Sequence, residues 1–248
     1  MSSMRHAANA SAHERAIPGM LRPLAHPVVA ILFGVVAVLV VAAFGFLLAK
    51  TPTVTNWDLA WDAYFSSIHT TALVAVGHAV YFIFSPVEAI ALVVVLTLIV
   101  FLVTRKWRSA LTFALSIGLT WLSSDVVKIL VDRPRPLATA LRDPYLPTPT
   151  DPSFPSGHAV FAAAIAVTFI FLVRGTGAKT LTWILGILLV VVVAGVLIYI
   201  GVHYPSDVIG SIIWSMGVAP AFLAIWNNWI IPRTYRRKKL APQDVPQP

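Results

Sequence analysis

Long uncharged apolar segments, separated by short polar stretches, recur along the whole chain. Because an α-helix rises 1.5 Å per residue, about 20 apolar residues cross a hydrocarbon core of about 30 Å. Segments near or above this length predict six transmembrane helices, at Val28–Leu48, Val87–Val103, Trp107–Val131, His158–Val173, Thr180–Val202 and Val208–Ile231. The chain is therefore expected to form an all-α, polytopic bundle of membrane helices.

Between the first two of these segments, aromatic residues recur at helical spacing while two aspartates lie on another side of the same helix. The aromatic residues are Trp57, Trp61, Tyr64 and Phe65, and the aspartates are Asp58 and Asp62. Aromatic rings are favoured where the bilayer meets water, so the pattern predicts a short interfacial helix. An ordinary loop helix is the alternative.

A second short segment, Thr70–Phe84, is apolar over only 15 residues, and Ser85-Pro86 interrupts the pattern before the next span. Proline breaks or kinks a helix because it lacks the backbone N–H. Two arrangements fit, either one long kinked hairpin or a half-inserted segment followed by a complete span. We favour the half-inserted segment.

The longest interruption, Asp132–Gly157, is rich in proline and predicts an ordered extramembrane loop. The N-terminal stretch is too long and polar for the n-region of a typical signal peptide, and the apolar run after it exceeds the usual length of about 7–15 residues, so this run is expected to stay as an uncleaved span. The expected organisation is a cytoplasmic tail over residues 1–27, one six-helix membrane domain over 28–231 and a basic cytoplasmic tail over 232–248.

Composition excludes an ordinary soluble domain. Hydrophobic residues make up 58% of the chain and charged residues 11%, against about 45–50% and about 25% in soluble proteins. The formal charge of +8 lies in short patches beside apolar segments, so the expected partner is the bilayer and not nucleic acid. Cysteine is absent, which excludes disulfides and thiolate chemistry.

The distribution of basic residues predicts the orientation. With a cytoplasmic N-terminus, six spans place 13 of the 18 basic residues on the cytoplasmic side, as the positive-inside rule requires. The other five are Lys50, Lys128, Arg133, Arg135 and Arg142. We expect a protein of the plasma (inner) membrane whose polar cluster, including His158, His203 and Asp207, lies on the non-cytoplasmic face.

Three groups of residues at the outer ends of the spans carry candidate chemistry. In the first, Lys128 ends the third span, and Arg133 and Arg135 follow in a rigid run. Charges at the membrane edge are costly and usually functional, and arginine binds oxyanions through its planar fork. The alternative is snorkelling with local pairing to Asp125 and Asp132.

The second group, Ser156-Gly157-His158, opens the fourth span. Free backbone N–H groups at a helix start, with a hydroxyl and a glycine, form a seat for an anion, and an ordinary helix cap is the alternative. In the third group, His203 precedes Asp207 by four residues. A carboxylate within reach can orient a catalytic imidazole, and the alternative is a structural hydrogen bond.

Together these groups resemble the type 2 phosphatidic acid phosphatase (PAP2) family. Its members carry Lys-x6-Arg-Pro, then Pro-Ser-Gly-His, then Ser-Arg-x5-His-x3-Asp. The matching residues here are, in order, Lys128 with Arg135-Pro136, Pro155-Ser156-Gly157-His158, and His203 with Asp207. The resemblance extends from about Trp57 to Ile231 and implies the integral-membrane, lipid phosphatase branch of the family.

The resemblance implies a mechanism. His203 would attack phosphorus to form a phosphohistidine, Asp207 would orient it, and His158 would protonate the departing oxygen. The residues implied to hold the phosphoryl oxygens are Lys128, Arg135, Ser156 and Gly157. No metal or other cofactor is implied.

One position departs from the family pattern. The arginine expected six residues before the nucleophile is Leu197 in this chain. Losing a charge-assisted contact to phosphate weakens transition-state binding, and about 1.4 kcal/mol corresponds to a tenfold loss in rate. Arg133 and Arg142, both in the loop, are the candidates to replace the missing side chain.

The expected activity is hydrolysis of a lipid phosphate or diphosphate. Polyprenyl diphosphate, phosphatidylglycerol phosphate and phosphatidic acid all fit a site at the bilayer edge. A lipid-linked phosphotransferase is the nearest chemical alternative. A catalytically impaired lipid-binding or scaffolding protein is the other alternative, and it is suggested by Leu197 at the position of the family arginine. The sequence leaves the oligomeric state open.

Overall fold

The computed structural model describes residues 19–232, and within this part of the chain every regular element is a helix. The long helices are α2 (Pro27–Lys50), α3 (Pro52–Ser67), α4 (Thr71–Ile83), α5 (Pro86–Thr104), α6 (Trp107–Val131), α7 (Gly157–Leu172), α8 (Lys179–Tyr199) and α9 (Pro205–Ile225). The 3-10 helices Gly19–Leu21 and Ala138–Ala140 and the π-helix Trp226–Ile230 complete the set. Most of both predicted tails, residues 1–18 and 233–248, lies outside the described residues.

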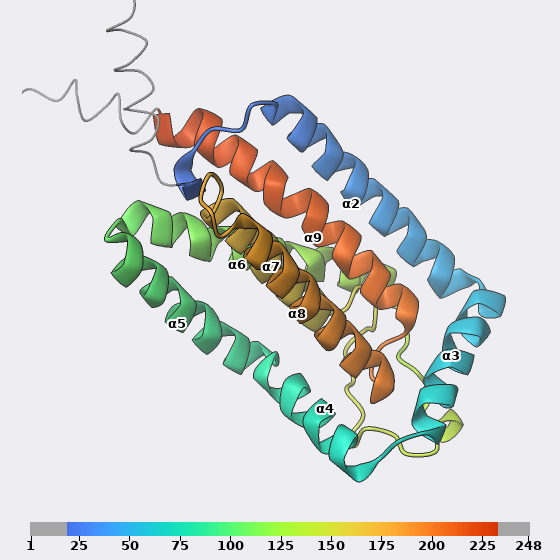
Figure 1. Cartoon of the computed structure of the whole chain (residues 1–248). Helices are drawn as coiled ribbons and strands as arrows, with labels where there is room; N and C mark the ends of the chain where they lie inside the picture. The colour runs from blue at the N-terminus through green and yellow to red at the C-terminus, as the bar shows by residue number, and fades with distance from the viewer. Residues whose placement is uncertain (1–18, 233–248) are drawn as a thin grey trace, which may run out of the picture.

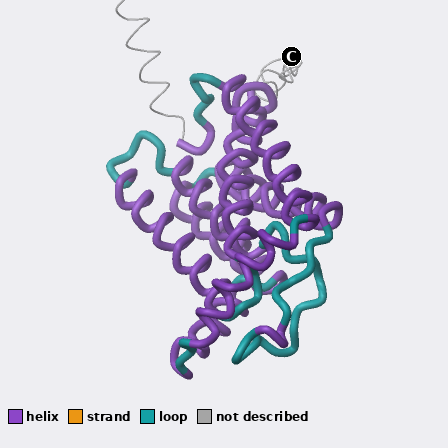
Figure 2. The backbone as a smooth tube through the Cα atoms, turned by 90° about the vertical axis from the view of Figure 1, so that its right-hand side faces the viewer, coloured by secondary structure: helices purple, strands orange, loops and turns teal. Residues whose placement is uncertain are grey.

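The bundle has two distinct ends. Residue 19 and the end of α9 lie at the same end (Figure 1), where the Asn227 side chain donates to the Met20 carbonyl at 2.9 Å. Helix α3 and the long loop between α6 and α7 lie at the opposite end, and Figure 2 shows that loop folded over the helix ends. The candidate active-site residues therefore lie at the end of the bundle opposite residues 19 and 232.

Membrane-spanning helices form the body of this integral membrane protein. By length and composition, five of the described helices can cross a bilayer, namely α2, α5, α6, α8 and α9. The sixth predicted span, α7, has only 16 residues, or about 24 Å of helix. Since α6, α8 and α9 pack around it and most of its residues are buried, α7 needs little length against lipid.

Helices α4 and α5 together form one bent element. Figure 1 shows them following one another in nearly the same direction, with the break at Ser85-Pro86. The kinked hairpin considered from the sequence is therefore wrong, because α4 does not fold back on α5. Proline at the first position of α5 starts a new helix at no cost in hydrogen bonds, which explains the break.

Close backbone approach joins the first and last spans. A Cβ atom added at Gly34 of α2 would lie 2.5 Å from the Ala221 Cβ, and one added at Gly217 of α9 would lie 2.3 Å from the Ala37 Cβ. Small residues on both helices therefore permit a close contact, as is common between membrane helices. This contact fixes α9, whose first turn carries Asp207, against α2.

Candidate active site

Phe154 anchors the loop that carries two of the three predicted motifs. Its ring is fully buried between α2 and α9, where a Cβ atom at either Gly45 or Gly210 would come within 2.5 Å of it. The next three residues lead into α7, and Ser156 caps that helix by accepting a hydrogen bond from the Ala159 N–H at 3.4 Å. The start of α7 is thereby held at the end of the bundle where α3 lies.

His203 lies at the centre of the gathered residues. It is fully buried in the short connection between α8 and α9, with its Nδ1 3.4 Å from Asp207 Oδ2 and its Nε2 3.2 Å from Arg135 Nη1. Because a guanidinium only donates, Nε2 must accept, which assigns the ring proton to Nδ1 facing Asp207. The Nε2 lone pair therefore points toward the basic residues.

The surroundings keep the His203 ring neutral. Burial is the main reason that its pKa lies well below the usual value of 6.5, and the charges of Arg135 and Lys128 lower this pKa further. A neutral imidazole is the form that acts as a nucleophile.

Lys128 and Arg135 form a two-cation cluster beside His203. Their side chains are only 13% and 6% exposed, and both bind the carboxylate of Asp151. Arg135 Nη2 lies 2.9 Å from Asp151 Oδ1, and Lys128 contacts the other oxygen. Burial alone would raise the pKa of Asp151, but hydrogen bonds and charge from Lys128 and Arg135 lower it to about 2. An anion is thus already bound at the cluster.

His158 lies across from His203 in the first turn of α7. The two ring centroids are 6.3 Å apart, and the His158 ring stacks on Tyr81 of α4 at 4.2 Å. His158 is 9% exposed, and its Nε2 has no hydrogen-bond partner among the described residues. One ring nitrogen is therefore free for a ligand.

Arg133 was expected to replace the missing family arginine, and this expectation is wrong. Its Nη1 donates to Asp207 Oδ1 at 2.6 Å and to Ser206 Oγ at 2.7 Å, while its Nη2 donates to Asp58 Oδ2 at 2.7 Å. The guanidinium also lies 4.2 Å from the centre of the Tyr204 ring. Because the side chain is only 1% exposed and both terminal nitrogens are engaged, it cannot bind a phosphoryl group.

Arg142 does not replace the missing family arginine either. Its side chain is exposed and donates to the Ser67 carbonyl at 3.0 Å, so it ties the loop to the end of α3. Leu197 itself is fully buried in the main apolar cluster of the bundle, together with Phe161 and Val193. Apolar packing therefore occupies the position where the family carries an arginine.

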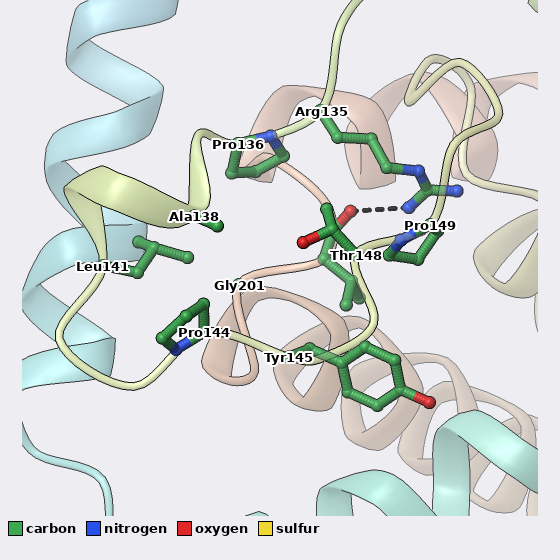
Figure 3. A pocket seen from close by; sticks show the side chains of 10 residues that line it. Arg135, Pro136, Ala138, Leu141, Pro144, Tyr145, Thr148, Pro149 and Gly201 are labelled. Carbon is green, nitrogen blue, oxygen red and sulfur yellow. Dashed lines mark hydrogen bonds between the residues drawn. The ribbon is translucent and has the colours of Figure 1, made fainter.

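A shallow pocket opens beside the cluster. Its walls are the loop between α6 and α7 and the turn after α8, and residues such as Pro136, Tyr145 and Gly201 line it (Figure 3). Arg135 also lines it and donates to the Val202 carbonyl at 2.7 Å (Figure 3). The pocket therefore shares Arg135 with the histidine site, although neither histidine lines it.

Three residues of this site were missed by sequence reasoning. Asp151 is an isolated acid between the basic run and Ser156, and that position is the signal that could have drawn attention to it. Asp58 could have been noticed because it lies on a helix rich in aromatic residues, where a buried carboxylate needs a partner. Tyr81 had no such signal, because its contact with His158 depends on how α4 packs.

Comparison with known proteins agrees with this geometry. The sequence profile of the PAP2 superfamily matches residues 109–231. An undecaprenyl-diphosphatase of Sulfolobus acidocaldarius is 36% identical over 130 residues, which cover 52% of this chain and 58% of that protein. Undecaprenyl-diphosphatase BcrC of Bacillus subtilis is 32% identical over 105 residues, covering 39% of this chain and 49% of that protein. The chain thus spans about half the length of these relatives.

A solved structure extends the similarity over most of the chain. The transmembrane PAP2-type phosphatidylglycerolphosphate phosphatase of Bacillus subtilis matches with a TM-score of 0.63 and 25% identity. The match covers 89% of this chain and all of that one. Because the motif residues meet at one end of a bundle with this fold, and the superfamily profile spans the helices that carry them, the chain belongs to the PAP2 superfamily.

Proposed function

We propose that the protein hydrolyses a lipid phosphate or diphosphate through a phosphohistidine formed on His203. The observation that carries the proposal is the placement of the His203 ring, with Nδ1 toward the Asp207 carboxylate and Nε2 toward the basic cluster. Nε2 attacks phosphorus, the bond to the leaving oxygen breaks, and the ring becomes positively charged. Asp207 then stabilises that charge.

The neighbouring groups complete the proposed cycle. Lys128, Arg135 and the backbone N–H groups at the start of α7, at Ser156 and Gly157, bind the phosphoryl oxygens. His158 gives a proton to the leaving oxygen and then takes one from the water that cleaves the phosphorus–nitrogen bond. Release of phosphate restores neutral His203. Fixed cationic side chains provide the charge stabilisation, so a metal ion is not required.

A polyprenyl diphosphate is the first candidate substrate, because both curated relatives are named undecaprenyl-diphosphatase. Phosphatidylglycerol phosphate is the second, from the name of the solved relative, and phosphatidic acid is the third. We place the site on the non-cytoplasmic face of the plasma (inner) membrane, with both termini in the cytoplasm, on the distribution of basic residues. A lipid headgroup can reach such a site by lateral diffusion.

Phosphate release tests the proposal. Full-length protein purified in detergent is given each of the three lipids, with and without EDTA, beside a His203→Ala preparation. We expect release by the natural protein with at least one lipid, the same rate in EDTA, and background release by the variant. If the folded protein releases no phosphate from any of the lipids, the enzyme proposal fails and the lipid-binding alternative replaces it.

A further inference from the structure

A continuous series of buried polar contacts leads from α3 to the His203 ring. Asp58 of α3 accepts from Arg133 at 2.7 Å, Arg133 donates to Asp207 at 2.6 Å, and Asp207 faces His203. Asp58, Asp207 and His203 are fully buried, and Arg133 is 1% exposed. The proposed mechanism uses only the last two residues of this series.

Asp58 also fixes the backbone on which Asp207 stands. Its Oδ1 accepts from the Ser206 N–H at 3.3 Å, and its Oδ2 accepts from the Ser206 hydroxyl. These bonds join the first turn of α9 to α3. Arg133 and Ser206 thus help to orient the Asp207 carboxylate, together with the Tyr204 N–H, which donates to Asp207 Oδ2 at 3.0 Å.

We infer that Asp58 and Arg133 are positioning residues that orient Asp207 and set how strongly it stabilises the His203 imidazolium, an inference that rests on the proposed phosphohistidine mechanism. The reasoning is electrostatic as well as geometric. One guanidinium is shared between two carboxylates, which leaves one uncompensated negative charge in a buried cluster. That charge lies beside the ring that becomes positive during attack, where charge interactions are strong.

The two residues should therefore act on His203 with opposite signs. Removing the Asp58 charge leaves Arg133 to neutralise Asp207 more fully, which disfavours imidazolium. Removing the Arg133 charge strengthens the field of Asp207, which favours imidazolium. The remaining charged or titratable groups facing His203 are Arg135, Lys128, His158 and Asp151, and none of the variants below changes them.

The same helix supplies a matched control. Asp62 is fully buried one turn after Asp58, and both of its carboxylate oxygens lack a hydrogen-bond partner among the described residues. Burial, followed by the charges of Asp207 and Asp58, raises the pKa of Asp62 to about 9. It is therefore neutral at pH 7, and Asp62→Asn replaces one neutral buried group by another of the same shape.

The test compares Asp58→Asn, Arg133→Gln, Arg133→Lys and Asp62→Asn in the full-length protein. We expect Asp58→Asn to lower kcat about tenfold with little change in KM, and to move the acid limb of the kcat/KM profile to lower pH. Arg133→Gln should move that limb to higher pH. Arg133→Lys, which keeps the charge, should leave the limb close to its natural position. Asp62→Asn should behave as the natural protein.

Each outcome decides the inference. If the acid limb stays in place in both Asp58→Asn and Arg133→Gln, or moves in the same direction in both, the two residues are structural only. If Arg133→Gln does not fold, the contrast between Asp58→Asn and Asp62→Asn decides. If the natural protein releases no phosphate, the proposed function fails separately. The His203 ring is then titrated by 15N NMR, where opposite shifts support the inference and unchanged titration overturns it.

Discussion

The carboxylate of Asp151 is bound by Arg135, the residue that also contacts the Nε2 atom of His203, so an acidic side chain of the loop occupies the cation cluster. A phosphoryl group that binds Lys128 and Arg135 must displace this carboxylate. Because the Asp151 side chain is half exposed, at 53%, it can move away without being buried elsewhere.

Replacing Asp151 should therefore strengthen anion binding. We expect Asp151→Asn to lower the inhibition constants of inorganic phosphate and vanadate, and the substrate KM, severalfold. The pKa of about 2 keeps Asp151 ionised throughout the neutral and mildly acidic range, so the effect should persist across that range. Asp143→Asn is the control, since its side chain is similarly exposed, at 60%, and pairs with His69 instead. Weaker inhibition in Asp151→Asn would show that the carboxylate organises the cations and does not compete with phosphate.

The nucleophile can be identified directly. Mixing the protein with a 32P-labelled lipid phosphate and quenching in alkali should trap an acid-labile phosphoryl group on His203, which His203→Ala cannot form. Asp207→Asn should still form it but should turn over about 10²- to 10⁴-fold more slowly, because orientation and charge stabilisation are lost. Label on His158 instead of His203 would reverse their assigned roles.

The pH profile should reflect the depressed pKa of His203. The ring must be neutral to attack, so kcat/KM falls only as pH drops through the folded-state pKa, and the acid limb should lie below pH 6.5. The sign for stability is the same. A histidine buried in neutral form stabilises the fold above its unfolded pKa, and this contribution is lost as pH falls. Rate and melting temperature measured against pH check both points, and an acid limb above pH 6.5 would contradict this account.

Restoring the family arginine should damage the protein. Leu197 is fully buried in the apolar cluster, so Leu197→Arg brings a charge into the core and should destabilise the fold by about 3–5 kcal/mol without raising kcat/KM. Leu197→Met conserves volume and should cost less than about 1.5 kcal/mol. Thermal melting and phosphate release measure the two effects. A rise in activity in Leu197→Arg would mean that the new side chain reaches the anion cluster.

Orientation can be tested with single cysteines, because the natural chain contains none. Thr148 lies in the exposed loop at the site end, and Thr176 lies in the exposed turn between α7 and α8. In intact cells, Thr148→Cys should react with an impermeant thiol reagent, and Thr176→Cys should react only after the cells are opened. The reverse pattern would place the site in the cytoplasm.

The helices were largely predictable because lipid-facing segments must be apolar and uncharged over their whole length. For this reason the span predicted at Val87–Val103 corresponds closely to α5 at Pro86–Thr104. The direction of α4 was not predictable, since a proline break permits either a continued or a reversed chain. Only packing against α8 and the loop decides between them.

The composition of the site was predictable, but the assignment of its two loop arginines was not. Arg133 and Arg135 are two residues apart, carry the same charge and flank the same proline. In the structure, Arg135 contacts the Nε2 side of His203 while Arg133 is buried behind Asp207. The deciding factor is Asp58, a carboxylate from a helix far away in sequence that needs a buried cation.

The close contact between α2 and α9 has a consequence for biosynthesis. The ribosome makes α2 first and α9 last, so their small-residue interface can close only when nearly the whole chain has entered the membrane. Asp207 begins α9, and hence its carboxylate reaches His203 only at that late stage. A chain whose synthesis stops between these two residues contains His203 without the carboxylate of Asp207. The pair of His203 and Asp207 is thus completed only by the last of the described spans.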